Sequence, residues 1–413
     1  MTRYMSILLI GCFVLSAPLS MADTLTICQT CPVKTIKQGL DKSKDGDVVI
    51  VKPGFYQEGN LNITKQITFL GEDFPVIDGN NNNEVLTINA DSVVVRGFLI
   101  QNVGTNYLED RAGININERD YCIIENNKLI NTFFGIYLKN VSDCIVRDNL
   151  IQGKAIEEIS SGNAIHAWKS KNLIIENNLA EKHRDGIYLE FVDNSVISGN
   201  TSRDNLRYGL HFMFSNHDQY RENIFLNNGA GVAVMFSRNI EMIQNRFEKN
   251  WGASSYGLLL KEIYDGKIEH NTFLSNTIGI YAEGANRLNF NYNDFEKNGW
   301  ALKILGSCMD NKFEYNNFIS NTFDLSTNSS RNYNEYIHNY WGDYTGYDLD
   351  KDGFGDVPYR PVKLFSYIVS KVDPSIILLR SLFIDILNFA EKVTPVFTPE
   401  SLKDVEPLMK PVK

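Results

Sequence analysis

The sequence predicts an all-β protein, a right-handed parallel β-helix with about 22 residues in each rung of the coil. Three observations predict it: a Gly followed fourteen residues later by an Asn, alternating apolar and polar positions after the Gly, and an Asn-rich turn that recurs in register. A unit this short cannot bury its own apolar side, so copies must stack. The Gly-to-Asn interval is identical in seven copies: Gly113–Asn127, Gly135–Asn149, Gly186–Asn200, Gly209–Asn223, Gly231–Asn245, Gly257–Asn271 and Gly279–Asn293.

Side chains within one copy alternate between two faces. Ile187 and Leu189 share one face of their segment, and Tyr188 and Glu190 share the other, which is the period of a β-strand. Short strands need neighbours, and a coil whose rungs pair in parallel supplies them at a spacing of about 4.8 Å. Asn suits the repeated turn, because it tolerates left-handed backbone angles and its amide can bond the same amide one rung away.

One interval is longer than the others. The distance from Asn149 to Asn178 exceeds the repeat by about seven residues. We expect the extra residues, around 155–161, to leave one corner of the coil as a loop.

The two ends of the coil need covers, because a β-helix leaves an open apolar end. Residues 28–44 fit a short amphipathic helix that would cover the first end, with Asp47–Val51 as the first strand. Near the other end, the apolar segment 376–389 is interrupted by Arg380 and Asp385, so we expect a helix too short and too charged to cross a bilayer. It packs on the coil or docks on a partner or a membrane surface, and prolines keep the last stretch extended.

The N-terminus predicts export. An apolar run followed by small residues fits a secretory signal cleaved after Ala22, and hence a soluble periplasmic protein. A lipoprotein box ending at Cys12 is the alternative, although the apolar run before it is short. We divide the chain into a signal (1–22), a β-helix with its N-terminal cap (23–362) and a C-terminal amphipathic helix with an extended tail (363–413).

Composition excludes one class of partner. The chain has 413 residues, 43% hydrophobic content and a net charge of −10. That is ample material for a core, and no basic stripe offsets phosphate, so we expect no nucleic-acid binding.

Five cysteines remain after the predicted cleavage. Cys28 and Cys31 form a CxxC that fits a disulfide, a redox pair or a soft-metal clamp. Cys122 and Cys144 each lie five residues before a repeat Asn, so they should point inward on adjacent rungs, as two small core residues or as a disulfide. Cys308 has no evident partner.

Stacked rungs gather equivalent outward residues into columns, and chemistry is best sought there. The second position after the Gly gives Asn115, Tyr137, His166, Tyr188, His211, Ala233, Leu259 and Tyr281. The fourth position gives Asn117, Lys139, Trp168, Glu190, Met213, Met235, Lys261 and Glu283.

These columns predict a soft-metal site. His211 and Met213 share one strand and one face, and Met235 lies one rung further, roughly 5 Å away. Imidazole with thioether and no carboxylate favours Cu(I) over hard cations. We therefore place a transient Cu(I) site there, with His166, two rungs away, and His217, at the next turn, as further ligands. Met residues packed under a loop and a His that contacts another protein are the alternative.

A second candidate site follows the repeats. Carboxylates at positions 1, 3, 5 and 9 with Gly at position 6 match the first part of a calcium loop, and Tyr359 stands at position 12, where the bidentate Glu would be. A turn with solvated carboxylates that caps the last rung fits as well. The carboxylates are Asp348, Asp350, Asp352 and Asp356.

One long segment carries a family resemblance. Residues 339–359, with Asn-Tyr-Trp-Gly-Asp-Tyr-Thr-Gly-Tyr-Asp at their start and Asp-Gly-Phe-Gly-Asp-Val-Pro-Tyr at their end, resemble the segment that ends the β-helix of the NosD family. Residues 46–56, 206–213 and 373–409 are similar to that family as well, so the resemblance spans nearly the whole mature chain.

The resemblance implies a non-enzymatic function in copper supply. Proteins of this family work with an ABC transporter, made of a cytoplasmic ATPase and a membrane permease, and with a membrane-anchored copper chaperone. Together they build the copper–sulfur centre of nitrous oxide reductase. It also implies that the C-terminal helix docks on the permease, which would place the protein at the membrane periphery. A polysaccharide-active or glycan-binding β-helix is the rival interpretation; such enzymes need clustered acids on an outer groove, and here Glu190 stands among His, Met, Trp and Tyr.

Overall fold

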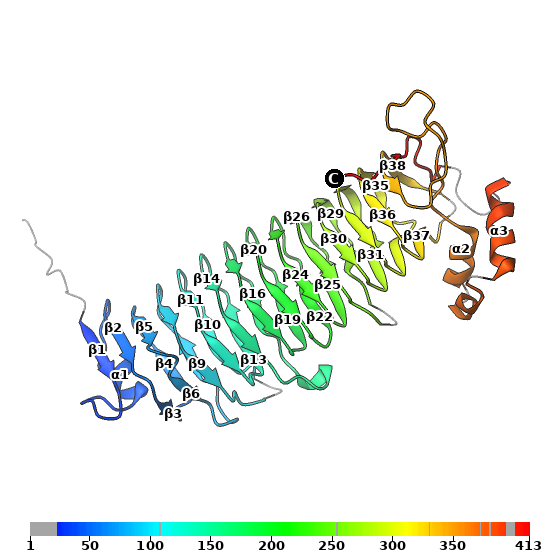
Figure 1. Cartoon of the computed structure of the whole chain (residues 1–413). Coiled ribbons are helices and arrows are strands. Elements are labelled where there is room, and N and C mark those ends of the chain that lie inside the picture. Colours follow the sequence, from blue (N-terminus) through cyan, green and yellow to red (C-terminus); the bar gives the residue numbers. More distant parts are fainter. Residues whose placement is uncertain are drawn as a thin grey trace, which may run out of the picture.

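A computed structural model describes residues 23–413 except 107–108, 253–254, 330, 372, 380 and 394–400. The predicted signal, 1–22, lies outside the described residues. Three long parallel sheets run along one coil, as Figure 1 shows, and confirm the right-handed parallel β-helix. Neighbouring strands of a sheet lie one rung apart, as in the pairing of Ile187 with Leu210.

Sheet A has 14 strands. They are β1 (Thr24–Ile27), β2 (Val48–Val51), β5 (Thr68–Gly71), β8 (Val94–Arg96), β11 (Ile123–Glu125), β14 (Ile145–Arg147), β17 (Ile174–Glu176), β20 (Val196–Ser198), β23 (Gln219–Arg221), β26 (Arg238–Ile243), β29 (Tyr264–Glu269), β32 (Asn286–Asn291), β35 (Met309–Glu314) and β38 (Tyr333–Ile337).

Sheet B has 13 strands. They are β3 (Phe55–Tyr56), β6 (Val76–Asp78), β9 (Leu99–Gln101), β12 (Lys128–Ile130), β15 (Leu150–Gln152), β18 (Leu179–Glu181), β21 (Thr201–Arg203), β24 (Ile224–Leu226), β27 (Arg246–Glu248), β30 (Thr272–Leu274), β33 (Asp294–Glu296), β36 (Asn317–Ile319) and β39 (Tyr340–Trp341).

Sheet C has 12 strands and carries the candidate metal site. They are β4 (Leu61–Ile63), β7 (Leu86–Ile88), β10 (Ala112–Asn117), β13 (Phe134–Lys139), β16 (Ile165–Trp168), β19 (Asp185–Glu190), β22 (Tyr208–Met213), β25 (Ala230–Met235), β28 (Leu258–Lys261), β31 (Ile278–Glu283), β34 (Trp300–Ile304) and β37 (Phe323–Ser326).

A buried asparagine ladder holds the rungs in register. From Asn149 onward, each ladder Oδ1 accepts from the backbone N and from the Nδ2 of the Asn one rung earlier, at 2.9–3.1 Å. Each Nδ2 also donates to a main-chain carbonyl of another rung, as from Asn245 to Tyr220 at 2.8 Å. The ladder comprises Asn127, Asn149, Asn178, Asn200, Asn223, Asn245, Asn271, Asn293, Asn316 and Asn339.

The left-handed residue of this turn is the one before the ladder Asn. Asn126, Asp148 and Glu222 have φ of 51°, 55° and 56°, whereas no ladder Asn has a positive φ. The expectation that the repeated Asn takes left-handed angles is therefore wrong. The left-handed position accepts many residue types, so the backbone angle is not what requires Asn in this repeat. The amide bonds of the ladder are the reason that Asn recurs.

The repeated Gly lets two rungs approach closely. A Cβ on Gly209 would lie 2.7 Å from the carbonyl oxygen of Gly231, which is backbone and cannot move aside. The Asn149-to-Asn178 interval does hold a loop at one corner, with the short 3₁₀ helix η1 (Glu158–Ser160) in it.

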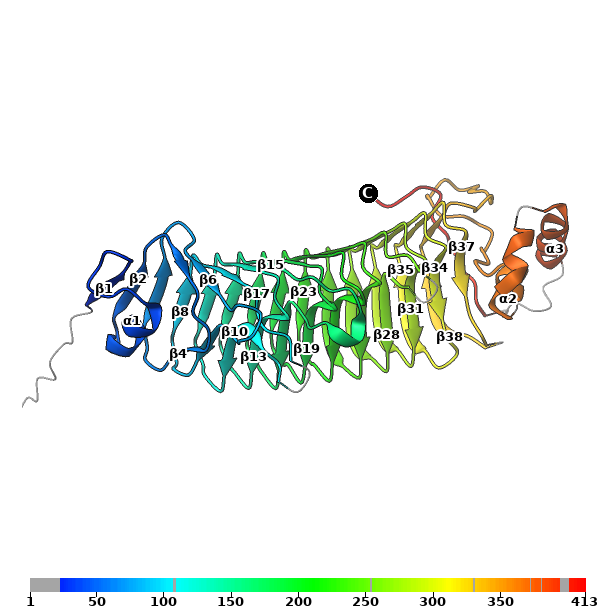
Figure 2. The ribbon, with the colours of Figure 1, turned by 90° about the horizontal axis from the view of Figure 1, so that it is seen from below.

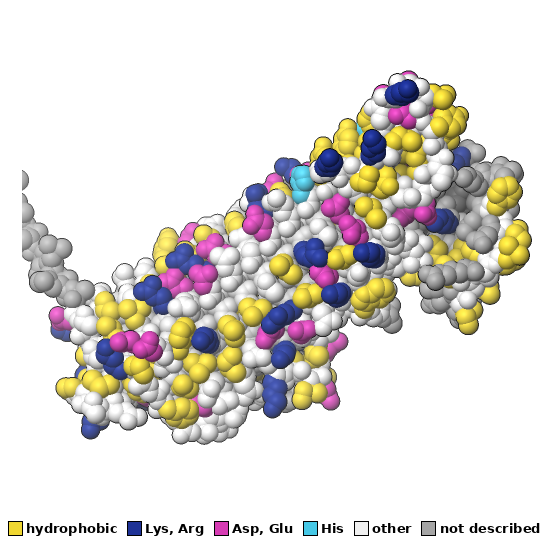
Figure 3. Space-filling model, in the orientation of Figure 1, with side chains coloured by type: hydrophobic (Ala, Val, Ile, Leu, Met, Phe, Trp, Pro, Cys, Tyr) yellow, Lys and Arg dark blue, Asp and Glu magenta, His cyan; other side chains and the backbone are white. Residues whose placement is uncertain are grey.

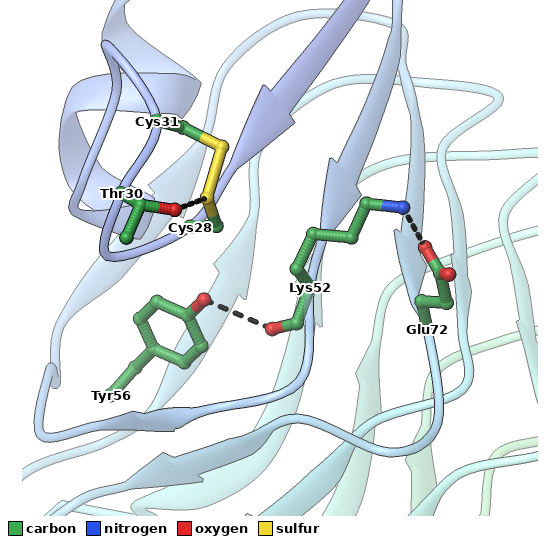
Figure 4. The surroundings of a disulfide bond; sticks show 6 residues. All are labelled: Cys28, Thr30, Cys31, Lys52, Tyr56 and Glu72. Atoms are coloured by element: carbon green, nitrogen blue, oxygen red, sulfur yellow. Dashed lines mark hydrogen bonds and ion pairs between the residues drawn. A yellow bond between two sulfur atoms is a disulfide. The ribbon is translucent and has the colours of Figure 1, made fainter.

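The N-terminal end differs from the expectation in two ways. The first strand is β1, which pairs with β2, so the coil begins about one rung before Asp47. The helix is shorter than 28–44: α1 spans Ile36–Lys42 and buries Ile36 and Leu40 against the core. Residues 28–33 instead form a turn closed by a disulfide between Cys28 and Cys31, which Figure 4 shows beside β1.

The C-terminal end holds three helices, α2 (Leu364–Lys371), η2 (Asp373–Leu378) and α3 (Leu382–Val393). Figure 2 shows α2 and α3 standing beyond the last rungs. Phe365, Val369 and Ile384 pack against Phe323 of β37, so the segment is anchored on the coil. No helix within the described ranges is long and apolar enough to cross a membrane.

The last residues return to the coil. Asp404 is fully buried, and its Oδ2 accepts from Asn339 N at 2.9 Å, Asn339 Nδ2 at 3.1 Å and Trp341 Nε1 at 3.0 Å. A carboxylate of the tail thus takes the place of the next ladder Asn. Further on, Val412 N donates to Asn317 Oδ1 at 2.9 Å.

Candidate metal centre

Backbone register places the predicted ligands as expected. Met213 and Met235 are direct partners across β22 and β25. His211 is paired with Ala233 on the same two strands and lies two residues before Met213, on the same outward side. Both Met residues are half-buried.

The His211 side chain is buried, and one of its ring nitrogens already contacts polar neighbours. Its Nδ1 lies 3.4 Å from Arg207 Nη2 and 3.9 Å from Asp185 Oδ2. Arg207 holds Asp185 through two bonds of 2.9 and 2.5 Å. The imidazole ring contacts the rings of Tyr188 and Tyr208, each with centroids 4.9 Å apart. Nε2 is buried and has no hydrogen-bond partner.

This environment keeps the imidazole neutral. Burial lowers the pKa of His211 to about 4, while the Asp185 carboxylate opposes the shift. Arg207 can only donate, so Nδ1 accepts in this arrangement and the proton of the neutral ring lies on Nε2. Nε2 would bind a metal after that proton moves to Nδ1, where Asp185 Oδ2 lies 3.9 Å away.

Two predicted ligands lie apart from this group. His166 lies between Tyr137 and Tyr188, at centroid distances of 4.6 and 4.7 Å, so the Tyr188 ring separates it from His211. Burial lowers the pKa of His166 to about 3. His217 is exposed in the turn after β22, and its Nε2 lies 3.1 Å from Asn239 Nδ2. Register puts His211, Met213 and Met235 on one outward side of β22 and β25, and His166 and His217 lie apart from them.

Met242 and the three free cysteines lie inside the coil. Met242 is fully buried, as its register predicts. Cys122 and Cys144 are free thiols buried on adjacent rungs, with Cys122 N donating to Cys144 Sγ at 3.4 Å, which confirms the interpretation as core residues. Cys308 is also free and buried, and Cys28 and Cys31 are joined in a disulfide.

The acidic loop shows features of both interpretations. Asp348, Asp350 and Asp352 each offer an oxygen within 4.8 Å of the others. Asp356 instead accepts from Leu349 N at 2.7 Å, inside the loop. Tyr359, at position 12, pairs with the backbone of residue 404 at 2.8 and 2.9 Å and so belongs to the end cap.

Sequence reasoning missed the pair behind His211. Asp185 directly precedes the repeated Gly186, at a register where Ala112, Phe134 and Ala230 are apolar, and Arg207 lies one residue before the partner position Tyr208 on the next rung. A charged residue at an otherwise apolar register was the available signal.

Residues 151–346 match the family model described as NosD, periplasmic copper-binding protein. The chain is 28% identical over 421 residues to a probable ABC transporter binding protein NosD of Pseudomonas aeruginosa, with 90% of each chain covered. It is 27% identical over 378 residues to the protein of the same name from Stutzerimonas stutzeri, which covers 86% of this chain and 85% of that one.

Solved structures resemble the chain in fold alone. The catalytic domain of an α-1,3-glucanase has a TM-score of 0.61 at 11% identity, covering 79% of this chain and 70% of its own. A tailspike protein of Dettilon has a TM-score of 0.59 at 12% identity, covering 72% and 65%. An exopolygalacturonase of Yersinia enterocolitica has a TM-score of 0.54 at 10% identity, covering 77% and 78%.

Proposed function

We propose that this chain, which matches the NosD family through residues 151–346, binds Cu(I) in the periplasm. It would supply this copper for the metal centre of nitrous oxide reductase. An ABC transporter and a membrane-anchored copper chaperone are its proposed partners. The single observation that carries the copper site is the juxtaposition of the Met213–Met235 pair with His211 on one outward patch of sheet C.

The ligand chemistry of this patch favours Cu(I). Two thioethers and one neutral imidazole are soft or borderline donors. Thioethers stay available in an oxidising compartment, where the CxxC thiols of this chain are joined as a disulfide. Methionines that are only half-buried suit a carrier, because copper that must leave again cannot be enclosed.

The C-terminal helices support docking on the permease. Ile377, Leu382, Phe383, Ile386 and Phe389 expose 57–85% of their surfaces on η2 and α3. Both ends of this helical segment are anchored on the coil, by the Leu325–Val362 bridge and by the Asp404 contacts. An apolar surface held this way fits a groove of a membrane protein or the interface of the bilayer.

An anaerobic Cu(I) titration tests the site. The double variant Met213→Ala, Met235→Ala should lose at least about tenfold in Cu(I) affinity, since two of three ligands are gone. Met309→Ala is the matched control, because this Met is 43% exposed on β35, away from the patch. Equal affinity of the double variant and the control would exclude this site.

The pH dependence gives a second test. A ligand whose pKa is about 4 stays neutral down to pH 5, so Cu(I) affinity should be flat between pH 5 and 8. A loss of affinity between pH 8 and 5 would show that a group other than His211 controls binding.

The glycan interpretation meets a physical obstacle. The exposed aromatic stack Tyr292–Tyr315 has centroids 5.3 Å apart and an interplanar angle of 7°, and Phe191, Phe214 and Phe236 stack in the same way. Rings stacked along the coil cover each other's faces, and a sugar stacks on a ring face. We therefore propose that the protein is not a carbohydrate-active enzyme, which release of uronate from a polysaccharide screen would contradict.

Calcium at the acidic loop stays a prediction. The observation that favours it is the convergence of Asp348, Asp350 and Asp352 within 4.8 Å. Isothermal titration with Ca²⁺ of the wild type and of Asp350→Asn tests it. Absence of heat in the wild type would leave the loop as a cap of the coil.

A further inference from the structure

A disulfide-bonded cysteine pair lies at the N-terminal end of the coil, on rungs well before those of the candidate copper site. Cys28 and Cys31 close the turn that follows β1, as Figure 4 shows. Both residues are half-buried, and the contact between Cys28 Sγ and Thr30 Oγ1, at 3.4 Å, is exposed. The other cysteines in the described part of the chain are free and buried. Within those residues, the pair is therefore where cysteine chemistry meets solvent.

The backbone holds this turn without help from the sulfur atoms. Cys28 N donates to Val33 O at 3.1 Å, and Cys31 N donates to Cys28 O at 3.2 Å. Val33 is buried in the core and forms a parallel bridge with Ile27, the last residue of β1. Because these contacts involve main-chain atoms and an apolar side chain, the turn should persist after reduction. The two thiols would then stay side by side.

The disulfide adds little to the stability of this end. Its cysteines are three positions apart in the sequence, and a disulfide stabilises less when the loop that it closes is shorter. The pairing of β1 with β2 and the burial of Ile36 and Leu40 of α1 also hold the end. Figure 3 shows charged side chains among the hydrophobic ones on one face of this end, so the cap is already polar toward solvent. An accessible disulfide that the fold does not need is of the kind that exchanges with other thiols.

After reduction, the turn offers a ligand set of two sulfurs. Residues 28–33 read Cys-Gln-Thr-Cys-Pro-Val and contain neither a carboxylate nor an imidazole. Thiolate ligands select soft cations, and Cu(I) is stable with two of them, whereas Zn²⁺ takes four ligands in structural sites. The Thr30 hydroxyl, which contacts Cys28 Sγ, can donate to a thiolate and so favours its charged form. The chemistry of the turn therefore suits Cu(I).

We infer that Cys28 and Cys31, once reduced, bind Cu(I) between their two thiolates. The protein thus carries a second copper site, which the redox state of the pair opens and closes. This inference goes beyond the proposed function, because the site uses neither Met213 nor Met235. The reductant is a protein dithiol of the oxidoreductase class, since a thiolate attacks a disulfide directly.

The electrons and protons balance in each step. The dithiol gives two electrons and two protons to the Cys28–Cys31 disulfide and itself becomes a disulfide. Each cysteine then loses its proton as its sulfur–copper bond forms, and copper stays Cu(I). When another disulfide takes the two electrons back, the sulfur–sulfur bond forms again, both sulfur–copper bonds break and the ion leaves.

The test counts the Cu(I) ions that the full mature chain holds. Cu(I) is titrated without oxygen against a chromogenic chelator, first with the oxidised protein and then with protein reduced by a phosphine that gel filtration has removed. Reduction should raise the count from about one ion to about two for each chain. The added ion should bring the near-ultraviolet absorption of a copper–thiolate bond, which thioether and imidazole ligands do not give.

Two paired substitutions locate the added ion. Cys28→Ser with Cys31→Ser should abolish the ion gained on reduction and keep the ion held by the oxidised protein, since a hydroxyl is no soft ligand. Cys122→Ala with Cys144→Ala is the matched control, because these two cysteines also lie on neighbouring positions but are buried inside the coil. The control should still gain the second ion. The Ser variant should unfold within about 4 °C of the wild type, because the loop it opens is short.

A reduced wild type that holds no more Cu(I) than the oxidised protein overturns the inference. An added ion that persists in the Ser variant overturns it as well, and so does an unfolding temperature of that variant lower by more than about 10 °C, which would make the pair a structural staple. The proposed function fails separately: it fails if the oxidised wild type binds no Cu(I), whereas the ion gained on reduction concerns the cysteine pair alone.

Discussion

The asparagine ladder lies inside the coil, and a surface formed by Met213, Met235 and the stacked phenylalanines Phe191, Phe214 and Phe236, which we call the Phe ladder, lies outside it. Both are built on the same rungs, yet they differ in what a change of residue does. Inside, Asn245 accepts from Asn223 and donates to Asn271, and each amide of the ladder bonds in the same way to the rung before it and the rung after it. Outside, the residue paired with Met235 is Met213 on one side and Lys261 on the other.

This difference shows which positions of a repeat protein indicate function and which indicate only the fold. A position that repeats is fixed by the neighbouring rung and reports on the fold. A position that departs from its column is free of that constraint, so its identity reports on something the coil does not need. His211, Met213 and the Phe ladder are departures of this kind.

The largest effect should come from breaking the inner ladder. Asn245→Leu removes the acceptor for Asn223 N and Nδ2, both at 3.0 Å, and the donor to Tyr220 O. Buried unsatisfied groups make this cost roughly 3–5 kcal/mol in the free energy of unfolding. Denaturant unfolding measures it, with Asn227→Gly at an exposed left-handed turn as a control that should change stability by less than about 0.5 kcal/mol. Equal midpoints would show that the ladder amides are dispensable.

A second change concerns Asp218, a carboxyl buried at the register that Asn311 and Asn334 occupy on later rungs. Its Oδ1 accepts from Ser195 N at 2.7 Å, and burial raises its pKa to about 8. The folded protein therefore holds this proton up to about pH 8, whereas the unfolded chain releases it near pH 4, so the folded state loses stability as pH rises between these values.

Asp218→Asn removes that loss, because the amide can bond Ser195 as the Asn residues do elsewhere. The variant should be more stable than the wild type by on the order of 3 kcal/mol at pH 8 and nearly equal to it at pH 4. Unfolding curves at the two pH values check this. A gain that is the same at both would attribute the effect to packing rather than to titration.

A third change tests whether the tail truly continues the ladder. Asp404→Ala leaves Asn339 N, Asn339 Nδ2 and Trp341 Nε1 without their acceptor. Local opening of the last rung should become easier by about 2 kcal/mol, seen as faster hydrogen exchange at residues 339–341. Asp404→Asn keeps an acceptor oxygen and should retain most of the protection. Unchanged hydrogen exchange in the Ala variant would show that the tail does not stabilise the last rung.

The sequence predicted the regular part of the molecule and only part of the rest. The interval from Gly to Asn fixed the register, and from it the pairing of Met213 with Met235 followed before any coordinates. The first rung escaped prediction, since Thr24–Ile27 carries neither the Gly nor the Asn of the repeat. The role of Asp404 escaped as well, because the contact with Asn339 spans 65 residues.

The candidate site was predicted incompletely for the same physical reason. Register tells which side chains share a column but not what covers them, so the burial of His211 and the insertion of the Tyr188 ring before His166 emerged only in three dimensions. The Phe ladder lies at a corner where Asn140, Lys169 and Glu262 also stand, so no repeating residue type marked it.

The smallest effect sharpens the comparison most directly. We expect that the coil does not need the Phe ladder for its stability. The triple variant Phe191→Asn, Phe214→Asn, Phe236→Asn relieves the left-handed backbone strain of three phenylalanines and loses two stacked ring contacts. Relief of backbone strain is worth about 1 kcal/mol at each of the three residues. Each of the two lost ring contacts is worth about 0.5–1.5 kcal/mol. The net effect is a stabilisation of about 1 kcal/mol. Thermal and denaturant unfolding measure it beside Asn245→Leu. If the triple variant is destabilised as much as Asn245→Leu, the phenylalanines belong to the residues that build the fold. The contrast between the inner and the outer side of the rung would then fail.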